Sequence, residues 1–120
     1  RGAKKITFVE NDERVIKILK QNLESLKITN NANIVIDKIE NFLKKNLLKK
    51  FEIIFLDPPF VENNYIKELK MIQEKKIYKK NHIIVIHREI KSFDNLEEIM
   101  NPLIIKEYGR SKIIFGKFLN

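Results

Sequence analysis

The chain of 120 residues contains no cysteine and only three glycines and three prolines. Without cysteine it cannot form disulfides, use a thiolate nucleophile or build a cysteine zinc site. No apolar stretch approaches the roughly 20 residues of a membrane-spanning helix, and the amino end lacks the apolar core of a signal peptide. We therefore expect a cytoplasmic protein that does not bind a membrane, and no residue pattern suggests a metal site.

The composition is ordinary for a folded domain, with 43% hydrophobic and 33% charged residues. A chain of this length is large enough to bury a core of its own. Its net charge is +8, which suits a partner rich in phosphate such as RNA. All but four of the 24 basic residues are Lys, however, so an AT-rich genome explains the charge equally well. Both explanations stay open, and two clusters of lysines are also compatible with solvated helix faces.

Hydrophobic periodicity predicts alternating strands and helices. Strands are predicted at residues 6–10, 33–36, 52–56, 82–86, 103–108 and 112–118. Helices are predicted from a cap at Asn11 or Asp12 to Leu26, and at residues 37–50, 64–76 and 95–100. The central runs 52–56 and 82–86 are apolar on successive residues, which is typical of strands covered on both faces. The order predicts an α/β fold with a mostly parallel sheet that ends in an antiparallel hairpin.

Three acidic residues lie where predicted strands end, namely Glu10, Asp37 and Asp57. Ligands of open parallel sheets bind outside the carboxyl ends of the strands, and an acidic residue there often accepts hydrogen bonds from ribose hydroxyls. For Glu10 alone, a carboxylate that complements the start of the next helix is the better interpretation.

The tetrapeptide Asp57-Pro58-Pro59-Phe60 is the strongest chemical signal. Each proline fixes its own backbone, lacks an N–H donor and pushes the preceding residue into an extended conformation. The result is a row of acceptors that can bind the N–H groups of an exocyclic amine, beside a ring that can stack on an extruded base. The alternative is a plain loop, because Pro-Pro and Asp are common in turns.

Three segments together resemble a known family: "ITFVENDERVIKILKQNLESL", "FEIIFLDPPF" and "YGRSKIIFGKF". They are similar to S-adenosylmethionine-dependent amino methyltransferases with a Rossmann-like class I sheet, and most to the RsmD family of 16S ribosomal RNA guanine-N2 methyltransferases. The resemblance covers essentially the whole chain. The D-P-P-F tetrapeptide is specific for methylation of amino nitrogens but is shared with DNA adenine and cytosine enzymes.

The resemblance implies a cofactor, S-adenosylmethionine, and a role for several residues. Glu10, with Asn11 beside it, would bind the cofactor's ribose, and Asp37 would contact its adenine. The family's adenine-binding position matches Lys38 better than Asp37. His87 matches a histidine that often follows the fifth strand, but the preceding Glu of the family is absent, and we interpret His87 as a surface-loop residue.

The catalytic residues implied are Asp57, Pro58, Pro59 and Phe60. Asp57 and the Pro58 carbonyl would hold the target amine, and Phe60 would stack on the guanine. The implied activity is methyl transfer to the exocyclic N2 of a guanine in small-subunit ribosomal RNA, by a monomer whose partner is that RNA or the small ribosomal subunit. A DNA adenine or cytosine methyltransferase and a non-catalytic basic RNA-binding module remain the alternatives.

The chain also departs from the family pattern at its amino end. The family's first strand and glycine-rich loop are not matched, since the only glycines are Gly2, Gly109 and Gly116. Residues 1–3 look like the end of a helix, so residues 1–120 are expected to be the carboxy-terminal portion of one catalytic domain. We expect this portion alone to bind the cofactor poorly, to be inactive, and to show a gap or rearranged pairing between its first and third strands.

Overall fold

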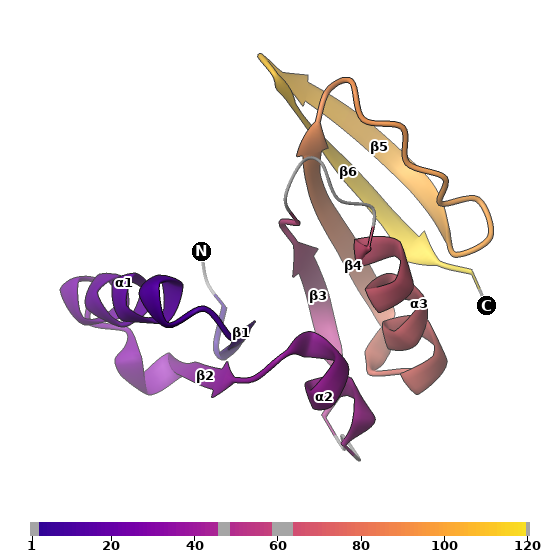
Figure 1. The fold of residues 1–120 in the computed structure, drawn as a ribbon. Helices are drawn as coiled ribbons and strands as arrows, with labels where there is room; N and C mark the ends of the chain where they lie inside the picture. The colour runs from indigo at the N-terminus through magenta and orange to yellow at the C-terminus, as the bar shows by residue number, and fades with distance from the viewer. Residues whose placement is uncertain (1–2, 46–48, 59–63, 120) are drawn as a thin grey trace. The chain divides into compact units, whose positions relative to one another are not determined.

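The computed structural model describes residues 3–45, 49–58 and 64–119. It divides into two compact units, an amino-terminal unit Arg1–Lys45 and a carboxyl-terminal unit Asn46–Asn120. Each unit contains one sheet (Figure 1). A gap or rearranged pairing between the first and third strands stays a prediction, since these strands belong to different units.

The amino-terminal unit alternates strands and helices. Its elements are β1 (Ile6–Glu10), α1 (Glu13–Ser25), the 3₁₀ helix η1 (Thr29–Asn31), β2 (Ala32–Ile36) and α2 (Ile39–Lys44). The two strands are parallel, in a register that aligns Ile6 with Ala32 and Glu10 with Ile36. Asp12 caps α1 by accepting a hydrogen bond of 2.9 Å from the Arg14 amide, which satisfies one of the free donors at the helix start.

The helices of this unit differ in detail from the predicted ones. In α1, Ile16 and Leu23 are buried, whereas Val15 and Ile18, which belong to the three- and four-residue apolar spacing that predicts this helix, are exposed. The second helix is much shorter than the predicted range 37–50, because Lys45 adopts an extended backbone and ends it. Its buried residues, Phe42 and Leu43, belong to the predicted apolar face.

The carboxyl-terminal unit is a four-stranded sheet with one helix. Its elements are β3 (Phe51–Leu56), α3 (Tyr65–Lys75), β4 (Tyr78–Glu89), β5 (Met100–Tyr108) and β6 (Ser111–Phe118). The strand order is β3-β4-β6-β5, with β3 and β4 parallel and the other neighbours antiparallel. α3 lies against one face of this sheet (Figure 1). The predicted α/β fold with a final antiparallel hairpin is confirmed, although only the β3–β4 pair of this sheet is parallel.

The core of the carboxyl-terminal unit forms where α3 meets the sheet. Tyr65, Leu69 and Ile72 of α3 are buried, as their spacing of three and four residues predicts, together with Ile84 and Ile86 of β4. Side chains alternate between the two faces of a strand, so residues on the other face are left uncovered by α3. Within β3, Ile53 and Phe55 are 66% and 61% exposed, and the prediction that this strand is covered on both faces is wrong.

The segment before β5 was predicted to be a short helix and is only a turn. The amides of Ile99 and Met100 both donate to the Leu96 carbonyl at 3.0 Å, and Met100 then begins the strand. No second helical turn follows because Met100 pairs with Phe118 of β6. Pro102 lies within β5, at the end of the strand order, where a missing N–H is tolerated. The β5–β6 register shifts between Pro102 and Ile104.

Two glycines shape the hairpin for different reasons. Gly109 has φ +57° at the turn, a left-handed conformation that favours glycine. A Cβ on Gly116 would collide with the Met100 side chain and lie 2.7 Å from the Asn101 carbonyl oxygen. Gly116 therefore permits the close approach of β5 and β6.

Candidate active site

Glu10 and Asp37 come together at the carboxyl ends of β1 and β2. β1 ends at Glu10 and β2 at Ile36, and these residues are paired in the ladder. The Asp37 amide continues that ladder by donating to the Glu10 carbonyl at 3.1 Å. Two of the three predicted carboxylates therefore occupy neighbouring strand ends of the amino-terminal unit, where a parallel sheet places its ligands.

The Glu10 side chain turns back to the start of α1. Its Oε1 accepts hydrogen bonds from the amides of Asn11, at 3.2 Å, and Asp12, at 3.1 Å. This is the helix-start role that the sequence offered as the alternative, and it fixes one carboxylate oxygen at the strand end. Asn11 contributes its backbone amide to this arrangement, and its side chain is exposed. A role of Glu10 and Asn11 in cofactor binding stays a prediction.

Asp37 is held in its ionised form by its neighbours. Hydrogen bonds from the Asn41 side chain, at 3.1 Å, and from the Lys38 amide, at 2.8 Å, lower the pKa of Asp37, and the charge of Lys45 contributes further. The Lys45 ammonium lies 3.7 Å from Oδ2. Asp37 is thus a half-buried, charged hydrogen-bond acceptor, which an amine donor on a ligand requires.

A second pair of polar residues lies where the parallel pairing of β3 and β4 ends. Leu56 of β3 is paired with Ile86 of β4 in the parallel ladder. The residues that follow them, Asp57 and His87, are therefore also neighbours. His87 Nδ1 lies 2.9 Å from Asp57 Oδ1. The Asp57 side chain is 60% exposed and that of His87 is 28% exposed, so the carboxylate is accessible and the ring is more enclosed.

The interpretation of His87 as a surface-loop residue is wrong. His87 belongs to β4, which continues to Glu89, and its ring is a hydrogen-bond partner of Asp57. A sequence signal for this contact exists, because Asp57 and His87 are the first polar residues after the two central apolar runs. Pro58 follows Asp57 after the end of β3, while Pro59 and Phe60 lie outside the described residues.

A buried polar network supports the same end of the sheet. Arg88, directly after His87, donates from Nε to Asp94 Oδ1 at 2.9 Å, and its side chain is 1% exposed. The Tyr65 hydroxyl donates to the same oxygen at 2.5 Å, and Ser92 Oγ donates to Oδ2 at 2.6 Å. The Arg88 guanidinium also lies 4.7 Å from the centre of the Tyr65 ring, a cation–π contact. The network ties the end of β4 to the start of α3.

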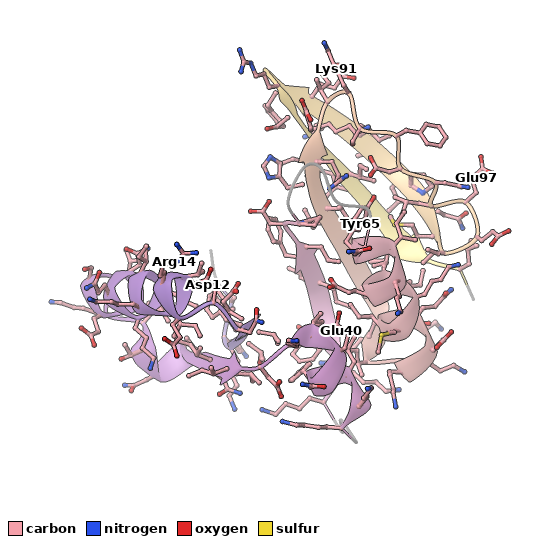
Figure 2. The ribbon with its side chains drawn as sticks, viewed as in Figure 1. Asp12, Arg14, Glu40, Tyr65, Lys91 and Glu97 are labelled. Carbon is pink, nitrogen blue, oxygen red and sulfur yellow. The ribbon has the colours of Figure 1, made fainter. Side chains whose placement is uncertain are left out.

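The network is charged although it is buried. Desolvation acts to raise the pKa of Asp94, but hydrogen bonds from Ser92 and Tyr65 and the Arg88 charge outweigh it and leave that pKa below its ordinary value. Burial and the neighbouring carboxylate raise the pKa of Tyr65. Tyr65 is therefore a neutral donor at physiological pH, and its place at the start of α3 is labelled in Figure 2. No motif in the sequence signals this network.

These observations define a class of protein. Parallel strands with polar residues at their carboxyl ends and a closing antiparallel hairpin match Rossmann-like methyltransferases. A crystal structure from Haemophilus influenzae superposes with a TM-score of 0.76 at 30% identity, covering 98% of this chain and 74% of that one. An S-adenosylhomocysteine-bound methyltransferase from Podospora anserina superposes with a TM-score of 0.69 at 13% identity, covering 97% of this chain and 61% of that one.

Sequence comparison gives the family. A protein-family model described as "Conserved hypothetical protein 95" matches residues 1–117. The chain belongs to this family, the RsmD methyltransferases. Ribosomal RNA small subunit methyltransferase D of Haemophilus influenzae is 36% identical over 91 residues, covering 74% of this chain and 47% of the relative. The enzyme of the same name from Buchnera aphidicola subsp. Acyrthosiphon pisum is 34% identical over 85 residues, covering 71% of this chain and 44% of the relative.

The chain is short compared with its relatives. The matched regions span about half the length of these two curated relatives. Among the residues that the structure describes, no helix is long and apolar enough to cross a membrane. The same residues contain no group of three or more His, Cys, Asp or Glu side chains that could hold a metal ion.

Proposed function

We propose that the protein transfers a methyl group from S-adenosylmethionine to the exocyclic N2 of a guanine in small-subunit ribosomal RNA. The observation that carries the proposal is the accessible carboxylate of Asp57, fixed at the end of β3 and followed by Pro58, in a chain of the RsmD family. The named relatives are ribosomal RNA small subunit methyltransferases. The proposal places the protein in the cytoplasm as a monomer that binds ribosomal RNA or the small subunit through its excess positive charge.

The first pair of carboxylates fits the proposed cofactor chemically. A ribose offers two hydroxyl donors and an adenine offers an amine donor, and each requires an acceptor. Glu10 and Asp37 supply acceptors on adjacent strand ends, and hydrogen bonds from Asn41 and the Lys38 amide lower the pKa of Asp37 further. We propose that Glu10, with Asn11 beside it, binds the ribose and that Asp37 binds the adenine amine. When bound, S-adenosylmethionine would supply an electrophilic methyl group for transfer to the target amine.

The second site acts on the target amine. The lone pair of the guanine amine is delocalised into the ring, so the nitrogen is a poor nucleophile. A hydrogen bond from this amine to the Asp57 carboxylate favours a more pyramidal nitrogen and stabilises the positive charge that develops there. The Pro58 carbonyl is proposed as a second acceptor, and Phe60 as the ring that stacks on the base. Most of the rate enhancement then comes from orientation of the amine.

The test is methyl transfer by the full-length gene product. Labelled S-adenosylmethionine is incubated with small-subunit ribosomal RNA or with DNA, and the product is digested to nucleosides and identified by chromatography. N2-methylguanosine from RNA is the expected product. Asp57→Ala is expected to reduce the rate far more than the cofactor affinity, whereas an unchanged rate would remove Asp57 from the mechanism.

The other products separate the alternatives. A methylated adenine or cytosine in DNA would keep the reaction class and refute the proposed substrate. Absence of label, together with salt-sensitive RNA binding that does not depend on the cofactor, would indicate a non-catalytic RNA-binding module. Size-exclusion chromatography with light scattering tests the monomer.

A further inference from the structure

We propose that His87 is the positioning residue of Asp57. In this assignment the Nδ1–H of His87 donates to Asp57 Oδ1 across the observed 2.9 Å, and this bond turns the carboxylate so that Oδ2 accepts from the target amine. The inference rests on the proposed methyl transfer, since it concerns the residue that meets the amine. It adds a hydrogen-bonded partner to the Asp57-Pro58 segment.

Asp57 needs such a partner because, among the described residues, His87 is the hydrogen-bond partner that its side chain has. Its carboxyl group is 60% exposed, and the terminal torsion of an aspartate is broad rather than confined to sharp rotamers. An exposed carboxylate that rotates among water molecules presents its lone pairs to a substrate in the right direction only part of the time. Orientation errors on the scale of one ångström reduce rates by as much as roughly 100-fold.

His87 is well placed to supply a fixed donor. Its backbone lies inside the sheet, where β4 is paired with β3 on one side and His87 itself is aligned with Ile113 of β6 on the other. The next residue, Arg88, is buried and held by Asp94. The ring therefore projects from a strand whose backbone is anchored by its neighbours, and this anchors the donor that it presents.

The assignment makes a specific statement about protons. A carboxylate only accepts, so Nδ1 of His87 must carry the proton of the shared hydrogen bond. It follows that Nδ1 cannot be the atom that takes a proton from the substrate. His87 orients the Asp57 carboxylate, and this effect should be reproduced by any side chain that places an N–H donor at the same point.

The chain provides an internal reference for this statement. Its second histidine, His82, is buried, with Nδ1 2.7 Å from the Lys79 carbonyl oxygen and Nε2 accepting from the Phe118 amide at 3.0 Å. That pattern requires a neutral ring with the proton on Nδ1. With only two histidines in the 120 residues, the imidazole nitrogens of both are resolvable by ¹⁵N NMR through long-range proton correlations.

The NMR experiment needs no activity. We expect a proton on Nδ1 of His87, as on Nδ1 of His82, and we expect Asp57→Ala to shift the His87 nitrogen signals while those of His82 stay in place. An unprotonated Nδ1 at His87, or His87 signals that do not respond to Asp57→Ala, would overturn the assignment.

The kinetic experiment compares two substitutions of His87 in the full-length gene product. His87→Phe keeps a planar ring without a donor, and we expect kcat to fall roughly 10- to 100-fold with little change in KM for S-adenosylmethionine. In His87→Asn the side-chain amide nitrogen is bonded to Cγ, as Nδ1 is, so we expect it to restore most of the rate. A His87→Phe variant with full kcat, or a His87→Asn variant as slow as His87→Phe, would refute positioning.

Failure of the two proposals can be told apart. If the unsubstituted protein makes no N2-methylguanosine, the proposed function fails, and the NMR experiment still decides whether the His87–Asp57 hydrogen bond exists as assigned. If the unsubstituted protein is active and the His87 variants behave contrary to expectation, the proposed function stands and the positioning role is refuted.

Discussion

Replacement of Asp94 by Ala is expected to destabilise the carboxyl-terminal unit strongly. Asp94 is 3% exposed and is the common acceptor of Arg88, Tyr65 and Ser92, with the Lys112 ammonium 3.5 Å away. The substitution leaves the Arg88 guanidinium buried without its carboxylate. Breaking a buried ion pair by removing one partner costs about 3–5 kcal/mol, a large part of the roughly 5–15 kcal/mol that holds a domain folded.

The assay is urea unfolding followed by circular dichroism, with thermal unfolding alongside. For a unit of this size each kcal/mol shifts the melting temperature by roughly 4–8 °C, so we expect a fall of at least about 12 °C. The matched control is Glu52→Ala in the same unit, which removes a 3.0 Å ion pair with Lys79 whose side chains are 66% and 55% exposed. An exposed pair contributes about 0–1 kcal/mol, so the control should melt near the parent protein.

The comparison can refute the reasoning. If the free energy of unfolding of Asp94→Ala lies within about 1 kcal/mol of that of Glu52→Ala, the buried network does not stabilise the unit. Should Asp94→Ala fail to fold, Tyr65→Phe removes only the hydroxyl and keeps the ion pair. Loss of a hydrogen bond to a charged acceptor predicts a destabilisation of about 1.5–3 kcal/mol, and an unchanged stability of Tyr65→Phe would equally show that the network does not stabilise the unit.

Three further outcomes are expected. Because the pKa of Asp94 is lowered in the folded protein, Asp94 contributes to the free energy of unfolding at pH values above the ordinary carboxyl range. This contribution is lost as the pH falls through the pKa of the folded state. Measured against pH in acid, the free energy of unfolding should therefore show a component that Asp94→Asn lacks. Gly116→Ala should cost about 1–3 kcal/mol in urea unfolding through the clash with Asn101, whereas Gly109→Asn, with open space and a residue that tolerates positive φ, should be nearly neutral. Glu10→Ala should weaken S-adenosylmethionine binding by calorimetry by about 1.5–3 kcal/mol with N2-methylguanosine still the product, and unchanged affinity would argue against ribose binding.

Local periodicity explains which parts of the fold could be predicted. The spacing of Tyr65, Leu69 and Ile72 identifies α3 and its buried face, because a helix brings these positions to one side whatever lies around it. Strand bounds were less predictable. β4 extends well beyond the apolar run 82–86 because its neighbour β6 pairs as far as Ser111 with Glu89, and a partner distant in sequence leaves no local signal.

The candidate site was predictable only where strand ends carry the chemistry. Glu10, Asp37 and Asp57 follow apolar runs, so their positions could be inferred, and the partner of Asp57 could have been found from the matching run before His87. The Arg88–Asp94 pair could not be predicted from the sequence, because charged residues in a polar segment normally indicate a solvated loop. Only the fold shows that the segment after β4 turns Asp94 inward.

Pro102 has a consequence for how the molecules behave together in solution. β5 is the last strand of its sheet and carries exposed apolar residues at Leu103, Ile104 and Ile105, a combination that invites a strand from another molecule to extend the ladder. Proline offers no N–H, and the register shift beside it bends the edge that an incoming strand would have to follow. Pro102 therefore disfavours pairing of the β5 edge with a strand of another molecule.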